Sequence, residues 1–259
     1  MCNFEGRFRC YALHLCTLGY AKQSLLKYIT LMPLTEIQQH LWERYRADEN
    51  DRIRHVLMES LSQFIDSLSN TPQEQWTDWV LDVSRDIVDG QSSFPIRYPL
   101  FERVIFPVLY EGYIGNIPNC ARWLAGFSQY IYKSKKCMGK LGESKFSEHA
   151  LLQRAIELDP DDHLAKTRLI RLLASSLDYS IHEVPWGVLY GINGASVEEC
   201  LMLAKELEDF CSLVDSENMR NDYNDLIEDC NYHFQMYADY LRNQKDFGSY
   251  EAFLNDNQS

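Results

Sequence analysis

Residues 154–174 read Arg154-Ala-Ile-Glu-Leu-Asp-Pro-Asp-Asp-His-Leu-Ala-Lys-Thr-Arg-Leu-Ile-Arg-Leu-Leu-Ala174. This pattern is typical of the end of one helix, a tight Asp-Pro-Asp-Asp turn, and the start of a second helix that runs antiparallel to the first. Downstream, Leu169, Leu173 and Leu177 recur at a spacing of four and therefore share one face of the second helix. The stretch predicts a helical hairpin over residues 146–177.

The composition extends this prediction to the whole chain. Of 259 residues, 46% are apolar and 24% are charged, which are ordinary values for a globular protein. Only 12 residues are glycine and 8 are proline, whereas a β-sandwich or barrel needs many turns. We expect a mainly α fold of nine or ten helices, packed as successive antiparallel hairpins in a helical-repeat-like bundle.

Several helix starts carry capping boxes. Thr35 with Gln38, and Ser196 with Glu199, have the spacing in which each residue satisfies a backbone amide of the other. After Thr35, an apolar stripe that begins at Ile37 is expected to face the core.

The expected organisation is an extension and two helical subdomains. Residues 1–31 show no clean helical period, so Met32 is expected to begin the folded part, and residues 1–31 form an N-terminal extension outside the fold. Residues 32–90 form an N-terminal subdomain and residues 91–259 a C-terminal one, because residues 90–99 are rich in turn formers. Residues 133–142 are expected to be a basic, flexible connector.

The charge is strongly negative and unevenly placed. The net charge is −13, which argues against nucleic acid or an anionic membrane as the main ligand, because both repel an acidic surface. Residues 196–259 contain 15 acidic residues and 4 basic ones. Two interpretations remain open: solvated helix faces, or an acidic surface that receives a basic partner protein.

Most chemical motifs are missing from the sequence. It contains no phosphate-binding loop, no dinucleotide fingerprint, no zinc-type spacing and no nucleophile elbow, so we expect no cofactor and no metal. Asp159, Asp161 and Asp162 cluster at a helix start, where carboxylates offset the positive end of the helix dipole. The eight cysteines form no Cys-x-x-Cys pair and are expected to be reduced thiols in the cytoplasm. No stretch is apolar enough to predict a transmembrane span.

The segment 178–194 is the least helical part by sequence. It contains His182, Glu183, Trp186 and Tyr190, with glycines and a proline that shape the backbone. A histidine beside a glutamate is compatible with a general-base pair or with half of a metal site. The alternative is that Trp186 fills the helical core while His182 and Glu183 bond to the backbone of the loop.

The hairpin at 146–174 resembles a tetratricopeptide repeat. Ala155 and Pro160 coincide with the alanine and proline of that motif, and Leu152, Leu169 and Leu173 take its large apolar positions. The resemblance implies a helix–turn–helix unit whose usual function is protein binding. It also implies that Thr167 and Arg171 lie on the concave, ligand-facing side.

The match departs from the motif in two ways. Lys166 stands where the motif has tryptophan, and Glu148 stands where it has a small residue. One period earlier or later the pattern is lost, whereas repeat arrays need several stacked units.

These observations favour a non-enzymatic, cytoplasmic protein-interaction module. An acidic antidote, or immunity-type protein, that covers a basic toxin is one form of this hypothesis. The main alternative is an enzyme with its site at the 178–194 loop. A third possibility is a structural subunit that buries the aromatic-rich helix at 217–242 in an oligomer.

Overall fold

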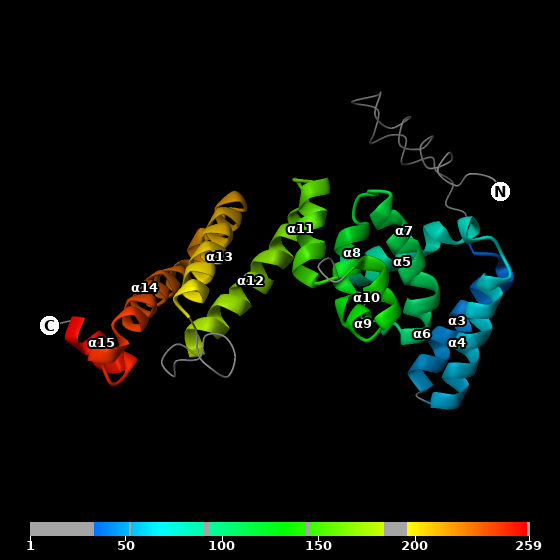
Figure 1. Cartoon of the computed structure of the whole chain (residues 1–259). Coiled ribbons are helices and arrows are strands. Elements are labelled where there is room, and N and C mark those ends of the chain that lie inside the picture. The colour runs from blue at the N-terminus through cyan, green and yellow to red at the C-terminus, as the bar shows by residue number, and fades with distance from the viewer. Residues whose placement is uncertain (1–33, 52, 91–93, 143–145, 184–195, 258–259) are drawn as a thin grey trace, which may run out of the picture. The chain divides into compact units, whose positions relative to one another are not determined.

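The structure is a computed structural model that describes residues 34–51, 53–90, 94–142, 146–183 and 196–257 (Figure 1). Every regular element within these ranges is a helix, which confirms the mainly α prediction. The predicted extension at 1–31 lies outside the described residues.

The described residues divide into two compact units: unit 1 ends at Leu158 and unit 2 begins at Asp159. The subdomain boundary expected at 90/91 stays a prediction; residues 94–100 lead into helices that pack on α5 (Thr77–Val88), the helix that precedes the loop. The predicted turn at 159–162 is thus the point where one unit ends and the next begins.

Unit 1 begins with the paired helices α3 (Glu36–Asp51) and α4 (Arg54–Ser69). The capping box predicted at Thr35 is confirmed: the Thr35 amide donates to Gln38 Oε1 at 3.0 Å, and the Gln38 amide donates to Thr35 Oγ1 at 3.3 Å. Gln38 is buried, and its side-chain amide is satisfied there because Nε2 donates to the Ser67 carbonyl and to Thr71 Oγ1. Ile37, expected in the core, is exposed instead.

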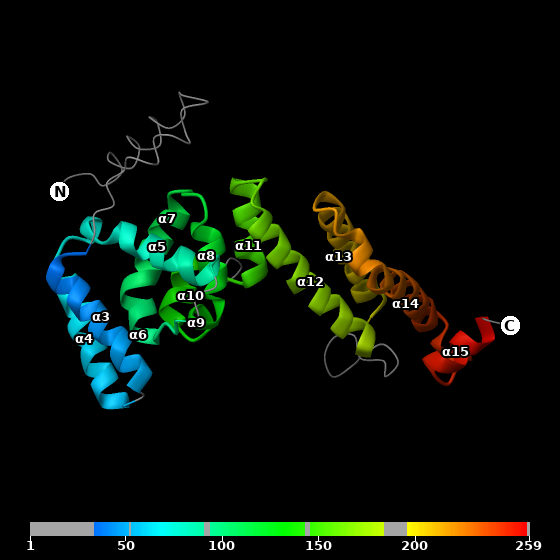
Figure 2. The ribbon, with the colours of Figure 1, turned by 180° about the vertical axis from the view of Figure 1, so that it is seen from behind.

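The rest of unit 1 is a cluster of short helices around α7 and α8 (Figure 2). The helix α8 packs against α5, α7 and α11. Gly126 of α8 lies very close to Val88 of α5. A Cβ atom added to Gly126 would come within 2.5 Å of the Cγ2 atom of Val88. The bounds are α6 (Tyr98–Leu100), η2 (Phe101–Ile105), α7 (Phe106–Ile114), α8 (Cys120–Gly126), α9 (Ser128–Tyr132), α10 (Lys135–Leu141) and α11 (Glu148–Leu158), with a short 3₁₀ turn η1 (Gln73–Gln75) before α5.

The helical run from Tyr98 to Ile114 continues through Pro107. Its η2 segment is a π-helical turn, in which the amide of Phe106 donates to the carbonyl of Phe101. Pro107 has no amide hydrogen and therefore donates no hydrogen bond to the preceding turn. The wider π-helical turn lies immediately before the α-helix that contains Pro107.

Unit 2 is built from three long helices and a short C-terminal one. They are α12 (His163–Glu183), α13 (Val197–Ser216), α14 (Asn224–Arg242) and α15 (Tyr250–Asn257), with 3₁₀ turns η4 (Arg220–Tyr223) and η5 (Gln244–Asp246). The helices α13 and α14 pack side by side, and α12 packs against both (Figures 1 and 2). The capping box at Ser196 and Glu199 is present at the start of α13, as predicted.

Candidate functional site

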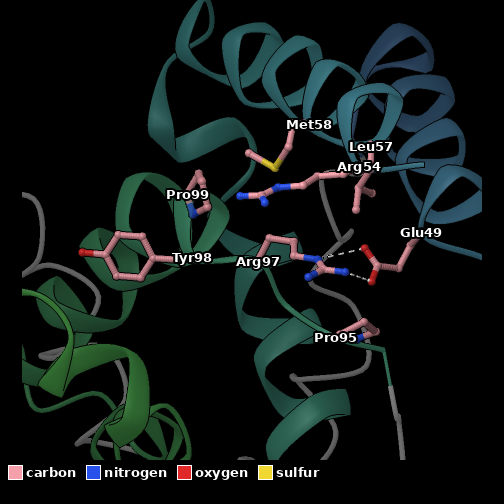
Figure 3. Close-up of a pocket in the computed structure, with 8 residues that line it drawn as sticks. All are labelled: Glu49, Arg54, Leu57, Met58, Pro95, Arg97, Tyr98 and Pro99. Atoms are coloured by element: carbon pink, nitrogen blue, oxygen red, sulfur yellow. Dashed lines mark hydrogen bonds and ion pairs between the residues drawn. The ribbon is translucent and has the colours of Figure 1, made fainter. Parts of the chain in front are cut away.

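A cleft of about 910 Å³ lies in unit 1 between α4 and the segment 95–99 (Figure 3). The start of α4 forms one wall and the extended approach to α6 forms the other, with the end of α3 between them. The lining combines charged and apolar side chains, namely Glu49, Arg54, Leu57, Met58, Pro95, Arg97, Tyr98 and Pro99.

One ion pair, between Glu49 and Arg97, forms part of the lining of this cleft. Arg97 donates from Nε to Glu49 Oε2 at 3.0 Å and from Nη2 to Glu49 Oε1, which is the two-pronged geometry that arginine and carboxylate prefer. The hydrogen bond to Glu49 raises the pKa of Arg97 above its ordinary value. Burial and the negative charge of Glu49 raise the pKa of the neighbouring Tyr45, which therefore stays a neutral phenol.

A second guanidinium group faces the same space. Arg54 is the first residue of α4, and Figure 3 shows its side chain beside Met58, reaching toward Pro99. Within the described ranges Arg54 forms no ion pair. The ring of Tyr98 points away from the other labelled side chains, and its hydroxyl lies 2.9 Å from Glu102 Oε1.

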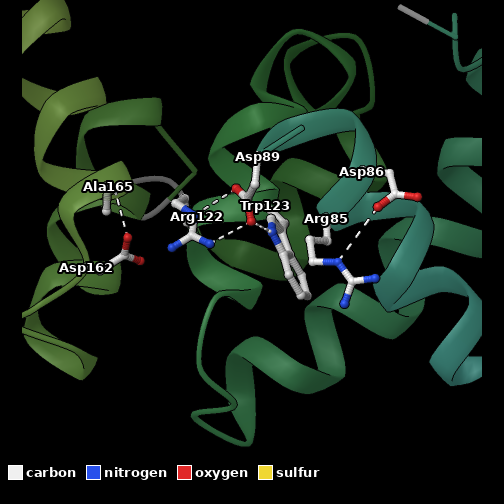
Figure 4. A network of polar contacts seen from close by, with 7 residues as sticks. All are labelled: Arg85, Asp86, Asp89, Arg122, Trp123, Asp162 and Ala165. Carbon is white, nitrogen blue, oxygen red and sulfur yellow. Dashed lines mark hydrogen bonds and ion pairs between the residues drawn. The ribbon is translucent and has the colours of Figure 1, made fainter. Parts of the chain in front are cut away.

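A buried polar network fixes the end of α5 to α8 (Figure 4). The carboxylate of Asp89 accepts from Arg122 Nε at 2.9 Å, from Arg122 Nη2 at 2.6 Å and from Trp123 Nε1 at 2.7 Å. Only 11% of the Asp89 side chain and 7% of the Arg122 side chain are exposed. Asp89 follows the C-terminus of α5, where a carboxylate is unfavourable, so the arginine offsets both the burial and the helix dipole. The network is a structural one.

Unit 2 has a smaller groove, of about 350 Å³, between α13 and α14. Leu201, Ala204 and Leu207 of α13 face Phe234 and Ala238 of α14 across it, so the lining is largely apolar. Leu201 and its neighbour Met202 are 58% and 70% exposed, although both are large apolar side chains.

Acidic side chains continue both walls of this groove. Glu208 is four residues beyond Ala204 on α13, and Glu228 is three residues before Asn231 on α14, so each lies on the groove-facing side of its helix. Both are exposed, and neither forms an ion pair with a cation of the described ranges. Asp239, farther along α14, lies 2.6 Å from Arg242.

The start of α12 is stabilised by the carboxylate of Asp162, the residue before the helix, and by the ion pairs of Glu217. Asp162 accepts from the Ala165 amide at 3.0 Å, which confirms the helix-start role predicted for the aspartates (Figure 4). Glu217 lies 2.6 Å from His163 Nδ1 and 2.9 Å from Lys166 Nζ. Burial raises the pKa of Glu217, but the hydrogen bonds from Lys166 and His163 outweigh it, and the net pKa is lowered.

The sequence-predicted site residues fall in two places. Thr167 and Arg171 lie one turn apart on α12, half-buried and exposed respectively. His182 and Glu183 belong to the last turn of α12, so the helix extends into the segment expected to be least helical. Trp186 and Tyr190 lie outside the described residues, and the predicted loop site stays a prediction.

Neither charged feature of unit 1 was predicted. The partners Glu49 and Arg97 are 48 residues apart, and Asp89 and Arg122 are 33 apart. Ion pairs between residues so distant leave no local pattern in a single sequence.

The thiols of the described cysteines are not activated. Burial raises the pKa of Cys120 and of Cys230 to about 12, and that of Cys200 to about 11. In the described ranges, no cluster of three metal-ligating side chains occurs. None of the helices described there is both long and apolar enough to cross a bilayer.

Comparison of the chain with protein-family models, with curated proteins and with solved structures gives no match.

Proposed function

We propose that this chain is a non-enzymatic protein-interaction module, and that the groove between α13 and α14 binds a basic, amphipathic segment of a partner protein. The observation that carries the proposal is the position of Glu208 and Glu228. They are exposed carboxylates without an ion-pair partner in the described ranges, and they continue the walls of an apolar groove.

Charge supports a basic partner. The region from Ser196 to the C-terminus has a net charge of −11, from 15 acidic and 4 basic residues. Such a surface attracts cationic segments over roughly a Debye length, about 8–10 Å at physiological salt, and speeds their encounter. The same field repels nucleic acid and anionic lipid.

The groove supports an apolar anchor on that partner. Leu201 is exposed at its edge, and Leu207 and Phe234 form buried parts of its lining. A volume of about 350 Å³ lies at the lower end of the range for ligand pockets, about 300–1,000 Å³, and accommodates a small number of apolar side chains. A partner helix with leucines on one face and lysines flanking them would fill the groove and meet Glu208 and Glu228.

Two further features belong to the same proposal. From the tetratricopeptide resemblance, we also propose that Arg171, which is exposed on α12, contacts the partner. We place the module in the cytoplasm, where its thiols stay reduced, and an acidic antidote of a basic toxin is one form that it would take.

The proposal is tested with an amphipathic peptide that has lysines on one helical face and leucines on the other. A peptide with glutamates in place of the lysines is its control. Fluorescence anisotropy of the labelled peptides should give saturable binding for the lysine peptide alone.

A matched pair of variants locates the site. Glu208→Gln with Glu228→Gln should weaken binding about tenfold, because two exposed ion pairs contribute about 1 kcal/mol together or somewhat more. Glu251→Gln with Asp256→Asn makes the same charge change on α15, where both residues are exposed, and should leave the affinity unchanged. Equal effects of the two double variants would show that only the net charge matters, and the groove assignment would be wrong.

A further inference from the structure

We propose that the cleft of unit 1 binds a small carboxylate that is attached to an apolar body. This ligand is opposite in charge to the partner proposed for unit 2, and the inference stands independently of it. It rests on two guanidinium groups and an apolar wall that face one cavity (Figure 3).

The lining of the cleft carries a net positive charge, although the chain as a whole is acidic. The lining holds two arginines and one glutamate, a net charge of +1, whereas the whole chain has a net charge of −13. Glu49 neutralises Arg97 and fixes its orientation through two hydrogen bonds. Arg54 keeps its full charge, since the described part of the chain gives it no acidic partner.

The two arginines have different roles. Arg97 uses Nε and Nη2 for Glu49 and has further N–H donors on Nη1, which makes it a positioned but partly occupied donor. Arg54 offers its whole planar fork, the geometry that matches a carboxylate in two parallel hydrogen bonds. A single carboxylate is therefore the head group that this charge balance fits, and a polyanion would lack further cations.

The remaining lining selects an apolar body for the ligand. Leu57, Met58, Pro95 and Pro99 contribute hydrocarbon to the walls, and Met58 is partly exposed. Ligand pockets usually have volumes of about 300–1,000 Å³, and this cleft has about 910 Å³. Methionine adapts its unbranched side chain to varied apolar shapes, so Met58 suits a flexible chain.

The test uses the methionine methyl groups as local reporters. The full chain, with its 7 methionines labelled at the methyl carbon, is titrated with octanoate and, separately, with octylammonium. A Met58→Leu variant assigns the Met58 signal. Octanoate should shift the Met58 methyl resonance saturably, octylammonium should not, and Met202 in unit 2 should stay in place.

Variants show whether Arg54 binds the carboxylate head group. Arg54→Gln should weaken octanoate binding by at least about tenfold, because it removes two charge-assisted hydrogen bonds and one of them alone is worth about that factor. Arg103→Gln is the control, because Arg103 is also an exposed arginine of unit 1 but pairs with Asp66 at 3.2 Å outside the cleft. An unchanged Met138 signal in the Arg54→Gln spectrum confirms that unit 1 keeps its fold, because Met138 lies on α10 outside the cleft. Equal shifts with octanoate and octylammonium, or no saturable shift, would overturn the proposal.

A carboxylate on an apolar body has two sources, a free acid or the C-terminus of a peptide. Acetyl-Leu-Leu with a free carboxylate is therefore compared with the same dipeptide ending in an amide. Tighter binding of the dipeptide acid than of octanoate assigns the cleft to a peptide C-terminus. Tighter binding of octanoate assigns it to an acyl chain, and equal binding of the dipeptide acid and amide refutes recognition of the carboxylate.

Discussion

Replacing Asp89 by alanine should be the most damaging single change among the polar groups of unit 1. Asp89 accepts three hydrogen bonds of 2.6–2.9 Å from Arg122 and Trp123. Removing one partner of a buried ion pair costs about 3–5 kcal/mol, because the remaining charge stays in a medium that solvates it poorly. We expect a loss in that range for Asp89→Ala.

The matched control is Asp86→Ala, in the last turn of α5 and three residues before Asp89. Asp86 also lies beside an arginine, at 3.7 Å from Arg85 Nε, but 68% of its side chain is exposed. Exposed ion pairs contribute about 0–1 kcal/mol, so this variant should lose less than about 1 kcal/mol. Figure 4 shows both aspartates.

Urea denaturation followed by tryptophan fluorescence measures this difference. Four of the 5 tryptophans, at positions 42, 76, 79 and 123, belong to unit 1. A Trp186→Phe background therefore makes the signal specific for that unit. If Asp89→Ala and Asp86→Ala lower the free energy of unfolding equally, the buried network does not stabilise the contact between α5 and α8.

Three further predictions concern other groups. Glu217→Gln should lower the free energy of unfolding of unit 2 by about 1–3 kcal/mol at neutral pH. Because folding lowers the pKa of Glu217, its stabilisation is present above the ordinary pKa of 4.5 and is lost as the pH falls through the lowered pKa. The stabilities of the variant and the wild type should therefore converge in acid. Gly126→Ala should destabilise unit 1 by about 1–3 kcal/mol through overpacking against α5, whereas Gly139→Ala, with nothing within 4 Å, should be neutral or stabilising in thermal unfolding. Cys120, buried and with a pKa raised to about 12, should be alkylated by iodoacetamide at pH 8 more slowly than the half-buried Cys211, as peptide mass mapping would show.

Local signals predicted the helix starts well. The capping boxes at Thr35 and Ser196 occur as expected, because each depends only on residues three positions apart. The same holds for Asp162 at the start of α12.

Tertiary contacts decided the positions that were predicted wrongly. Periodicity alone placed Ile37 in the core, but Gln38 takes the buried position because Ser67 and Thr71 of the next segment satisfy its amide group. Residues 133–142 were expected to be flexible, whereas most of them form the helix α10. Ser134 caps this helix, and its residues Cys137 and Leu141 are buried. A run of lysines obscures such a short amphipathic helix.

The candidate sites were predictable only in part. The acidic character of the C-terminal region is a property of composition and needs no structure. The groove at Glu208 and Glu228, and the cleft at Arg54 and Arg97, depend on which helices pack together. One sequence alone does not contain that information.

The salt dependence of lysine-peptide binding tests the central claim most directly. If Glu208 and Glu228 meet cationic side chains at the α13–α14 groove, raising the salt from about 50 to about 300 mM should weaken binding several-fold in the wild type, and less in the Glu208→Gln, Glu228→Gln variant. An affinity that is indifferent to salt, or a salt dependence that the double variant retains in full, would contradict the account.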